Sequence, residues 1–313
     1  MALQRGAVCP VPQEEQTMAD GRAVVFGGTG FLGRRIMARL ERMGIAAVAA
    51  SRHRPNRDGE HVAADVTDPA SIERAVVGAA VVVNCVSLYV EAGDATFKAI
   101  HVGGACNLAR ATARSNARLI HISGIGADQS SASPYVRARG EGEVAVREAM
   151  PEAVIVRPSI MFGPGDAFVS TIARLSRSLP VLPLFGTGAT RMQPVHVEDV
   201  AAGVLVAMER AEATGVTFEL GGPEIMTYRE VIRRVAGWCE ARPLLVPFPL
   251  FGWRLLAGAA RLWPTPPITE GQVALMRHDN VVSGDAAGLV DLGVTATVMT
   301  REAAFGEVPA ASP

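Results

Sequence analysis

Residues 23–36 read Ala-Val-Val-Phe-Gly-Gly-Thr-Gly-Phe-Leu-Gly-Arg-Arg-Ile, and this stretch decides the fold. A short apolar run leads into spaced glycines, and apolar residues then recur at helical spacing as far as Met43. The pattern predicts a strand, a tight turn and a helix. Gly27 lets the chain turn out of the strand, Gly30 lets the backbone approach a pyrophosphate, and Gly33 lets the helix pack against the sheet.

The turn is predicted to bind the diphosphate of a dinucleotide. Phosphate oxygens meet free N–H groups at the N-terminus of a helix. Three spaced glycines alone are weak evidence, but the flanking strand and helix supply the context that the motif requires. The other interpretation is a plain strand-to-helix turn without a ligand. The expected cofactor contacts in this loop are Gly27, Thr29, Gly30, Phe31, Leu32 and Gly33.

Length and composition fit one sizeable globular domain with a smaller lobe. The chain has 313 residues, 49% of them hydrophobic, and a formal net charge of -1. It has no Lys/Arg run of the kind that follows a nucleic-acid backbone, so nucleic-acid binding is not expected. Four scattered cysteines, and six histidines without ligand spacing, predict reduced thiols in a cytoplasmic protein and no metal site. Residues 1–20 lack the apolar core of a signal peptide and are expected to form a disordered tail.

Strand and helix patterns alternate along the first half of the chain. This alternation predicts a doubly wound α/β fold with a parallel Rossmann sheet, whose ligand lies at the carboxyl ends of the strands. Residues 21–165 are expected to form the NAD(P)-binding domain, to which residues 193–222 return. Residues 166–192 and 223–313 are expected to form a smaller, mainly helical lobe for a substrate or partner. The expected strands cover residues 45–50, 79–86, 119–123 and 153–158, and the expected helices cover residues 69–77 and 95–113.

The segment after the strand over residues 45–50 indicates which dinucleotide binds. Dinucleotide folds that take NAD place an acidic residue here for the ribose 2′-hydroxyl, whereas this chain has the run Ser51-Arg52-His53-Arg54. A hydroxyl and guanidinium groups suit a 2′-phosphate, so the sequence predicts NADP(H) rather than NAD(H). The other interpretation is a solvated basic loop. Further along, Asp65 and Val66 are expected to flank the adenine, and Val86 ends a strand at the cofactor.

A second set of polar residues follows the strand over residues 119–123. Ser123 lies at the carboxyl end of that strand and therefore at the predicted ligand face. Tyr135 follows a predicted helix start, Ser133-Pro134, and Arg139 lies four residues later on the same helical face. The sequence leaves two interpretations open for Tyr135 and Arg139: a catalytic pair, or a surface helix face that only lines the cofactor.

These motifs together resemble the short-chain dehydrogenase/reductase superfamily, in its extended or atypical branch. The resemblance implies that Tyr135 is a general acid/base and that Ser123 polarises the substrate oxygen. In the family a Lys holds the ribose and lowers the pKa of the Tyr, and here that position is Arg139. Arg supplies the charge but a different hydrogen-bond geometry, so slow or absent hydride transfer is expected.

One branch of the superfamily fits from about residue 21 onward. The glycine loop, residues 151–159 with Pro158 and Ser159, residues 193–197, and residues 247–250 resemble the NADPH-carrying accessory subunit of respiratory complex I and its bacterial relatives. The resemblance implies that Pro158 and Ser159 lie near the nicotinamide and that the nucleotide is structural. His196 is expected to be a hydrogen-bonded structural residue.

The C-terminal third carries a capping box at Thr227 and Glu230 and an apolar segment over residues 250–263 whose only charges are arginines. This segment is too short to span a bilayer. Two interpretations are open: the segment docks on a partner or lies at a membrane interface, or it forms a helix buried in the lobe, which the pattern slightly favours. The residues expected to make the contact are Phe251, Trp253, Leu256 and Trp263.

The sequence therefore carries two hypotheses for function. The first is an NADP(H)-binding protein that serves assembly or stability of a respiratory or ubiquinone-related complex, in the cytoplasm or at the cytoplasmic face of the inner membrane. The second is a working NADP(H)-dependent reductase or epimerase for a small or isoprenoid substrate such as a quinone. Arg139 favours the first hypothesis, while Ser123 and Tyr135 keep the second open.

Overall fold

The computed structural model describes residues 21–53, 59–253, 258, 273 and 275–306. Several sequence-based expectations lie outside this part of the chain. These are the tail over residues 1–20, the cofactor contact of Arg54, and the contacts of Leu256 and Trp263.

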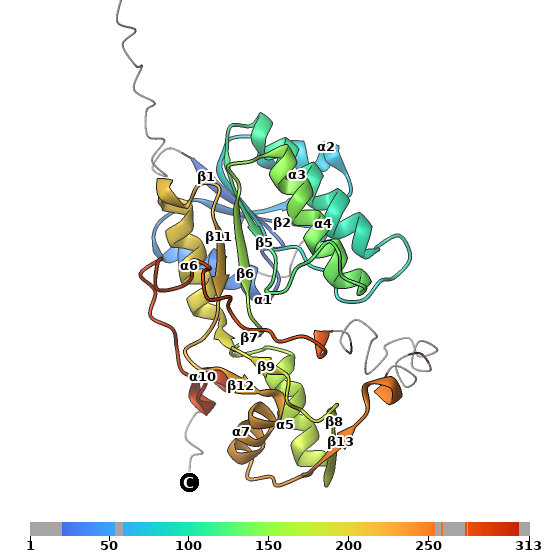
Figure 1. Cartoon of the computed structure of the whole chain (residues 1–313). Helices are drawn as coiled ribbons and strands as arrows, with labels where there is room; N and C mark the ends of the chain where they lie inside the picture. The colour runs from blue at the N-terminus through green and yellow to red at the C-terminus, as the bar shows by residue number, and fades with distance from the viewer. Residues whose placement is uncertain (1–20, 54–58, 254–257, 259–272, 274, 307–313) are drawn as a thin grey trace, which may run out of the picture.

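A seven-stranded parallel sheet forms the centre of the molecule (Figure 1). Its strand order is β11-β6-β5-β4-β1-β2-β3. Strands are added toward one edge from β1 to β3 and toward the other edge from β4 onward, so the strand order reverses between β1 and β4. This order contains the 3-2-1-4-5-6 arrangement of dinucleotide-binding folds, and it confirms the predicted doubly wound α/β fold. The strands are β1 (Arg22–Phe26), β2 (Ala47–Ser51), β3 (His61–Ala63), β4 (Ala79–Asn84), β5 (Arg118–Ile122), β6 (Val154–Pro158) and β11 (Thr217–Leu220).

Helices cover both faces of the sheet because its strands are apolar on both sides. In β1, Val25 packs against one layer of helices and Val24 against the other, as the two-residue period of a strand requires. α1 and α6 form the first layer, and α2, α3 and α4 form the second (Figure 1). The helices are α1 (Phe31–Arg42), α2 (Pro69–Val76), α3 (Ala105–Arg114), α4 (Pro134–Ala149) and α6 (Val197–Glu209).

Local sequence signals set several of these boundaries. Asp68 caps α2 by accepting a hydrogen bond from the backbone of Ala70, and Pro69 occupies the first turn. The helix expected over residues 95–113 begins instead with a π-helical turn, η2 (Lys98–Gly104), and continues as α3. π-helical turns are frequent at functional sites. A Cβ on Gly142 of α4 would lie 2.1 Å from the carbonyl oxygen of His101, so this glycine lets α4 pack closely on η2.

A third hydrophobic cluster, separate from the two that pack on the faces of the sheet, holds the C-terminal lobe together. Short paired strands and the helices α5, α7 and α10 build this lobe below the sheet (Figure 1). The predicted capping box is confirmed, because the side chains and backbones of Thr227 and Glu230 bond reciprocally at the start of α7. The lobe elements are β7 (Met161–Phe162), α5 (Phe168–Ser178), β8 (Val181–Phe185), β9 (Arg191–Met192), β10 (Val195–His196), β12 (Met226–Thr227), α7 (Tyr228–Trp238), β13 (Leu244–Phe248) and α10 (Arg301–Phe305). The short helix η3 (Ala211–Ala213) lies between α6 and β11, and its Ala213 packs in the core of the sheet domain.

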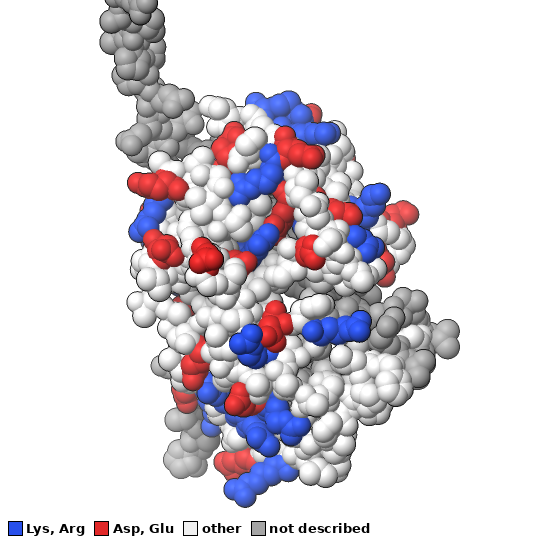
Figure 2. Space-filling model, viewed as in Figure 1, with Lys and Arg blue, Asp and Glu red and all other residues white. Residues whose placement is uncertain are grey.

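Strands β8 and β13 pair in parallel and expose one apolar side, which we call the outer face. It consists of Val181 and Pro183 on β8 and of Leu244 and Val246 on β13, which are paired in register. Leu244 is 64% exposed, whereas Leu184 on the inner side of β8 is fully buried. In Figure 2 the surface over these strands carries no Lys, Arg, Asp or Glu.

The segment that follows β13 contains two of the predicted contact residues, Phe251 and Trp253, and their surroundings differ. The indole Nε1 of Trp253 donates to the carbonyl oxygen of Leu184 at 2.9 Å, and its ring packs on Phe185 and Phe248. The expectation that Trp253 faces a partner is therefore wrong, because this side chain anchors the segment to β8. Phe251 is 69% exposed.

Candidate functional site

The glycine loop joins β1 to α1 in the geometry that the motif predicts. Gly27 has a φ of 75°, which favours glycine, and its N–H donates to the carbonyl oxygen of Ala50. A Cβ on Gly33 would lie 2.2 Å from the carbonyl oxygen of Gly27, so only glycine lets α1 approach the loop this closely. Gly30 is exposed and precedes α1, and its neighbours Thr29 and Phe31 are half-buried beside it. The backbone of this loop is thus exposed at Gly30, at the N-terminus of α1, where phosphate groups bind, and we call the loop together with this helix end the dinucleotide cradle.

The residues expected to select the cofactor follow β2. Ser51 ends the strand, and its hydroxyl donates to the carbonyl oxygen of His53 and lies 2.9 Å from Nε2 of His61. Arg52 comes next and is exposed. An exposed guanidinium at this strand end is free to meet an anion that lies along the edge of the sheet.

The residues expected beside the adenine follow the ends of β3 and β4. Asp65 accepts hydrogen bonds from the backbone and hydroxyl of Thr67, which fixes the turn before α2. Val66 is buried and Val86 is half-buried. The Asn84 side chain accepts a hydrogen bond from the backbone N–H of Val86 and so holds the chain as it leaves β4.

Ser123 follows β5 at the carboxyl end of the sheet, as the sequence predicts. Only 3% of the residue is exposed, and within the described residues its hydroxyl has no hydrogen-bond partner. A buried hydroxyl without a partner is unfavourable, so its place at a ligand-binding edge is consistent with a bond to a bound molecule. Gly124 comes next, and the guanidinium carbon of Arg139 would lie 3.4 Å from a Cβ at that position.

Tyr135 and Arg139 meet on one side of α4. Nη1 of Arg139 donates to the Tyr135 hydroxyl, and the guanidinium carbon lies 5.5 Å from the centre of the ring. Tyr135 is only 5% exposed and packs against Tyr89, Phe97 and His101, so its side chain is not part of an exposed helix face. Burial raises the pKa of the Tyr135 phenol above its ordinary value, although the charge of Arg139 opposes this shift.

Two buried histidines lie behind this pair, and sequence reasoning did not single them out. His121 on β5 pairs its Nδ1 with the side-chain amide of Asn84 at 3.1 Å. His101 in η2 hydrogen-bonds the backbone of Leu88. Burial, and then the charge of Arg139, lower the pKa of His101 to about 4 and that of His121 to about 3, so both imidazoles are neutral at physiological pH. The polar residues at the ends of two apolar strands, Asn84 and His121, were the available signal.

Pro158 and Ser159 lie at the carboxyl end of β6. The carbonyl oxygen of Pro158 accepts a hydrogen bond from Ile125, and the Ser159 hydroxyl donates to the side chain of Asn280 at 2.6 Å. The Asn280 amide in turn donates to the carbonyl oxygen of Ile125. The Ser159 side chain is thus committed to holding loops together, and its expected contact with a cofactor stays a prediction.

The remaining candidate groups, His196 and Cys85, have surroundings that indicate a structural role. Nε2 of His196 lies 3.0 Å from the carbonyl oxygen of Ala303, and its ring packs edge-on against Phe162. Burial raises the pKa of the Cys85 thiol to about 12, which makes it a poor nucleophile. Within the described residues there is no group of three or more His, Cys, Asp or Glu that could hold a metal ion. No helix in the described ranges is long and apolar enough to cross a membrane.

The structure therefore brings most of the predicted site to one edge of the sheet. The glycine loop, the ends of β2 and β4, and the Ser123, Tyr135 and Arg139 group all follow strands at their carboxyl ends. This is where open α/β sheets bind their ligands. The close backbone approaches that only glycine permits, and the Ser123 hydroxyl, which has no partner among the described residues, fit a dinucleotide with a polar group beside it.

Comparison with known proteins agrees with this geometry. A model of the family described as NAD dependent epimerase/dehydratase matches residues 23–221. The mitochondrial NADH dehydrogenase (ubiquinone) 1 alpha subcomplex subunit 9 of Mus musculus is 33% identical over 294 residues, which cover 88% of this chain and 76% of that protein. Ceramide reductase of Caulobacter vibrioides is 33% identical over 241 residues, which cover 74% of this chain and 75% of that protein.

A solved structure shares the fold at lower identity. MoeE5 in complex with UDP-glucuronic acid and NAD has a TM-score of 0.69 and 18% sequence identity, over 90% of this chain and 96% of that one. The resemblance that the motifs indicated is thus confirmed. The chain belongs to the NAD-dependent epimerase/dehydratase family of the short-chain dehydrogenase/reductase superfamily, and mitochondrial complex I subunits are among its homologues.

Proposed function

We propose that this protein binds NADP(H) as a long-lived structural cofactor and serves assembly or stability of a respiratory or ubiquinone-related complex. One observation carries the proposal. The dinucleotide cradle is intact, whereas the Tyr135 hydroxyl beside it is buried and bonded to a guanidinium. A protein with this arrangement keeps the nucleotide site and weakens the proton transfer that turnover needs.

The choice of NADP(H) rests on the end of β2. Ser51 and Arg52 occupy the place where folds that take NAD carry an acidic residue. An exposed guanidinium makes charge-assisted hydrogen bonds to phosphate oxygens, and each such bond contributes roughly 1.5–3 kcal/mol. The 2′-phosphate is present in NADP(H) and absent from NAD(H), so this contribution discriminates between the two.

Weak turnover follows from the state of Tyr135. NADPH supplies a hydride when bound, and reduction of a carbonyl also needs a proton donor whose pKa lies near the working pH. Burial moves the pKa of Tyr135 away from that range. Arg139 is held on the phenol by its own hydrogen bond, so it is not a free ammonium-like group for the ribose.

The outer face supports contact with a protein partner. It is apolar, exposed and uncharged, as the centre of a stable protein interface is. The homologous subunit from Mus musculus carries the name of a subunit of NADH dehydrogenase. We take the occupant of the outer face to be a subunit of such a respiratory complex, at the cytoplasmic face of the inner membrane.

Substitution of Arg52 tests the cofactor. Arg52→Ala should weaken NADPH binding about ten- to a hundredfold and leave NADH binding nearly unchanged, because only NADPH loses a phosphate contact. Fluorescence titration of both nucleotides measures the two affinities. Arg42→Ala, which removes an exposed arginine at the end of α1, is the matched control. Equal losses for the two nucleotides would mean that Arg52 serves folding or a general phosphate contact.

Substitution on the outer face tests the partner. Leu244→Glu should abolish co-purification of the tagged full chain with respiratory-complex subunits from native membranes, while its melting temperature changes little. Val290→Glu places the same charge at an apolar residue that is 88% exposed and lies outside the outer face, and should co-purify normally. Binding of purified protein to lipid vesicles alone, lost in Leu244→Glu, would replace the protein partner with a membrane surface.

A working reductase is the second candidate function, and the partnerless hydroxyl of Ser123 favours it. In this alternative Ser123 and Tyr135 bind the oxygen of a small or isoprenoid carbonyl or quinone substrate. Oxidation of bound NADPH against a panel of such compounds compares the wild type, Tyr135→Phe and Arg139→Lys. Steady wild-type turnover that Tyr135→Phe abolishes would overturn the structural-cofactor proposal. Activity gained only by Arg139→Lys would support a disabled reductase.

A further inference from the structure

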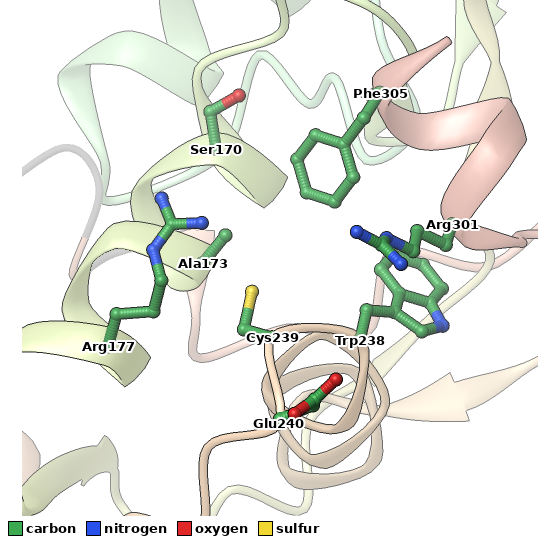
Figure 3. A pocket seen from close by; sticks show the side chains of 8 residues that line it. All are labelled: Ser170, Ala173, Arg177, Trp238, Cys239, Glu240, Arg301 and Phe305. Atoms are coloured by element: carbon green, nitrogen blue, oxygen red, sulfur yellow. The ribbon is translucent and has the colours of Figure 1, made fainter. Parts of the chain in front are cut away.

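A cavity of about 500 Å³ lies in the C-terminal lobe between α5, the end of α7 and α10 (Figure 3). Its volume is in the range of small-molecule sites. The residues that line it come from the lobe alone, and none belongs to the strand ends that form the dinucleotide cradle. The proposed nucleotide and partner sites therefore leave this cavity without a function.

Two arginines enter the cavity from different helices. Arg177 comes from the last turn of α5 and Arg301 from α10, and in Figure 3 both guanidinium groups point toward the open space. Neither forms a hydrogen bond or ion pair with another described residue. By contrast, the guanidinium of Arg234 on α7 forms two hydrogen bonds to Glu224. Both residues are exposed, so water solvates their guanidinium groups in the free protein, and a bound anion would take the place of that water.

The rest of the lining is apolar on one side and carries one carboxylate on the rim. The rings of Trp238 and Phe305 meet edge to face, with centroids 6.1 Å apart, and form an aromatic wall. Glu240 also lines the cavity and has a left-handed backbone φ of 54°. The arginines and Glu240 together give the site a net charge close to +1, which matches one negative charge on a ligand and not two.

We propose that this cavity binds a small monocarboxylate with an apolar body. The planar guanidinium group of an arginine matches the geometry of a carboxylate, and Arg177 and Arg301 offer this group from two sides of the cavity. Trp238 and Phe305 contact the apolar body of the ligand. Cys239 also lines the cavity and its thiol points into the open space (Figure 3), so it reports on occupancy without taking part in recognition.

Calorimetric titration of the full chain with octanoate tests the proposal. Octanoate should bind saturably, and octanamide, which has the same shape and no charge, should bind at least about tenfold more weakly. Octyl phosphate carries the second negative charge and should also bind more weakly than octanoate. Equal binding of octanamide, or tighter binding of octyl phosphate, would overturn the assignment of a monocarboxylate site.

Variants locate the binding to this cavity. Arg177→Gln and Arg301→Gln should each weaken octanoate binding about ten- to a hundredfold at an unchanged melting temperature. Arg174→Gln removes an exposed arginine from the same helix but outside the cavity, and should bind octanoate as the wild type does. The two test residues lie on different helices, so the proposal can still be tested if one of the variants does not fold. Wild-type affinity in both would overturn it.

Alkylation gives a second measurement that does not depend on any variant. Octanoate should slow the reaction of Cys239 with iodoacetamide, as measured by mass spectrometry of the labelled peptide. Cys106 is half-buried in α3, away from the cavity, and serves as the internal reference. Equal rates at Cys239 with and without saturating octanoate would place the ligand elsewhere and overturn the proposal.

Discussion

One face of α4 carries polar residues that belong to two different clusters. Tyr135 and Arg139, with Ser123, form the functional cluster, and Glu143 one turn further on belongs to the structural cluster. The other members of the structural cluster are Arg157, Glu219 and Ser283. Glu143 accepts hydrogen bonds from Arg157, which also bonds Glu219 at 3.2 Å. Glu219 in turn accepts from the backbone and hydroxyl of Ser283. In this structural cluster each charge has an opposite charge beside it. In the functional cluster Arg139 bonds only a phenol, and Ser123 beside it has no partner among the described residues.

The difference separates buried polar groups that stabilise the fold from buried polar groups that the proposed function assigns to a ligand. A satisfied network resists change because removal of one member leaves the others buried without a partner. A group without a partner contributes little to stability, and its free energy is recovered only when a ligand binds. Substitutions in the two clusters should therefore have unequal effects on folding.

The largest loss of stability should come from Arg157→Ala. It leaves the buried carboxylates of Glu143 and Glu219 without their cation, which costs about 3–5 kcal/mol in the free energy of unfolding. Denaturant titration measures this loss. Arg114→Ala breaks an exposed pair with Glu73 and should cost about 0–1 kcal/mol. Similar losses in the two variants would mean that the Arg157 network is solvated and structurally unimportant.

The two clusters also differ in how far the sequence predicts them. The glycine loop, the cap at Asp68, and the four-residue spacing of Tyr135 and Arg139 are local patterns, and the sequence predicts each one. The structural cluster joins α4, β6 and β11, and Arg157 and Glu219 lie 62 positions apart. No local pattern indicates that pair, because it depends on which strand lies at the edge of the sheet.

The C-terminal lobe was harder to predict for the same reason. The outer face forms only because β8 and β13, about sixty residues apart, pair in parallel, and both strands contain proline, which argues against strands in a sequence. Trp253 illustrates the consequence. Its composition and neighbours suggest an interface residue, but its packing partner Phe185 is supplied by a distant strand.

The next effect in size is a dependence of the free energy of unfolding on pH. The histidines behind the functional cluster should respond at a higher pH than the structural cluster does. His101 and His121 have pKa values lowered to about 4 and about 3 in the folded chain, mainly by burial, against an ordinary value of 6.5. The unfolded chain therefore binds more protons below pH 6.5, and stability falls as the pH drops. Each imidazole should remove about 2 kcal/mol between pH 6.5 and pH 5. Denaturant titration across this range measures the slope.

A variant assigns this slope to the two histidines that lie behind the functional cluster. His121→Asn keeps an acceptor for Asn84 and removes one imidazole, so the slope should fall by about half, while His278→Asn on the surface should keep it. The structural cluster responds at lower pH. Burial raises the pKa of Glu219, but the bonds from Ser283 and Arg157 outweigh it and the net pKa is lowered, so its stabilisation is present above about pH 4.5 and is lost below. An unchanged slope in His121→Asn would contradict the assignment.

The smallest effect is expected from a matched pair of serine substitutions, and it tests the comparison most directly. Ser283→Ala removes a hydroxyl that donates to the Glu219 carboxylate at 2.7 Å, and should cost about 1–2 kcal/mol in the free energy of unfolding. Ser123→Ala removes a buried hydroxyl with no partner among the described residues, so relief of its desolvation should offset the lost packing and leave stability within about 0.5 kcal/mol of the wild type.

Denaturant titration without nucleotide compares these two serine variants. A loss in Ser123→Ala as large as that in Ser283→Ala would mean that the Ser123 hydroxyl is already satisfied, for instance by ordered water. The functional cluster would then be as complete as the structural one. A near-zero change would instead support the view that the Ser123 hydroxyl has no partner in the free protein and forms its hydrogen bond with a molecule that binds at the edge of the sheet.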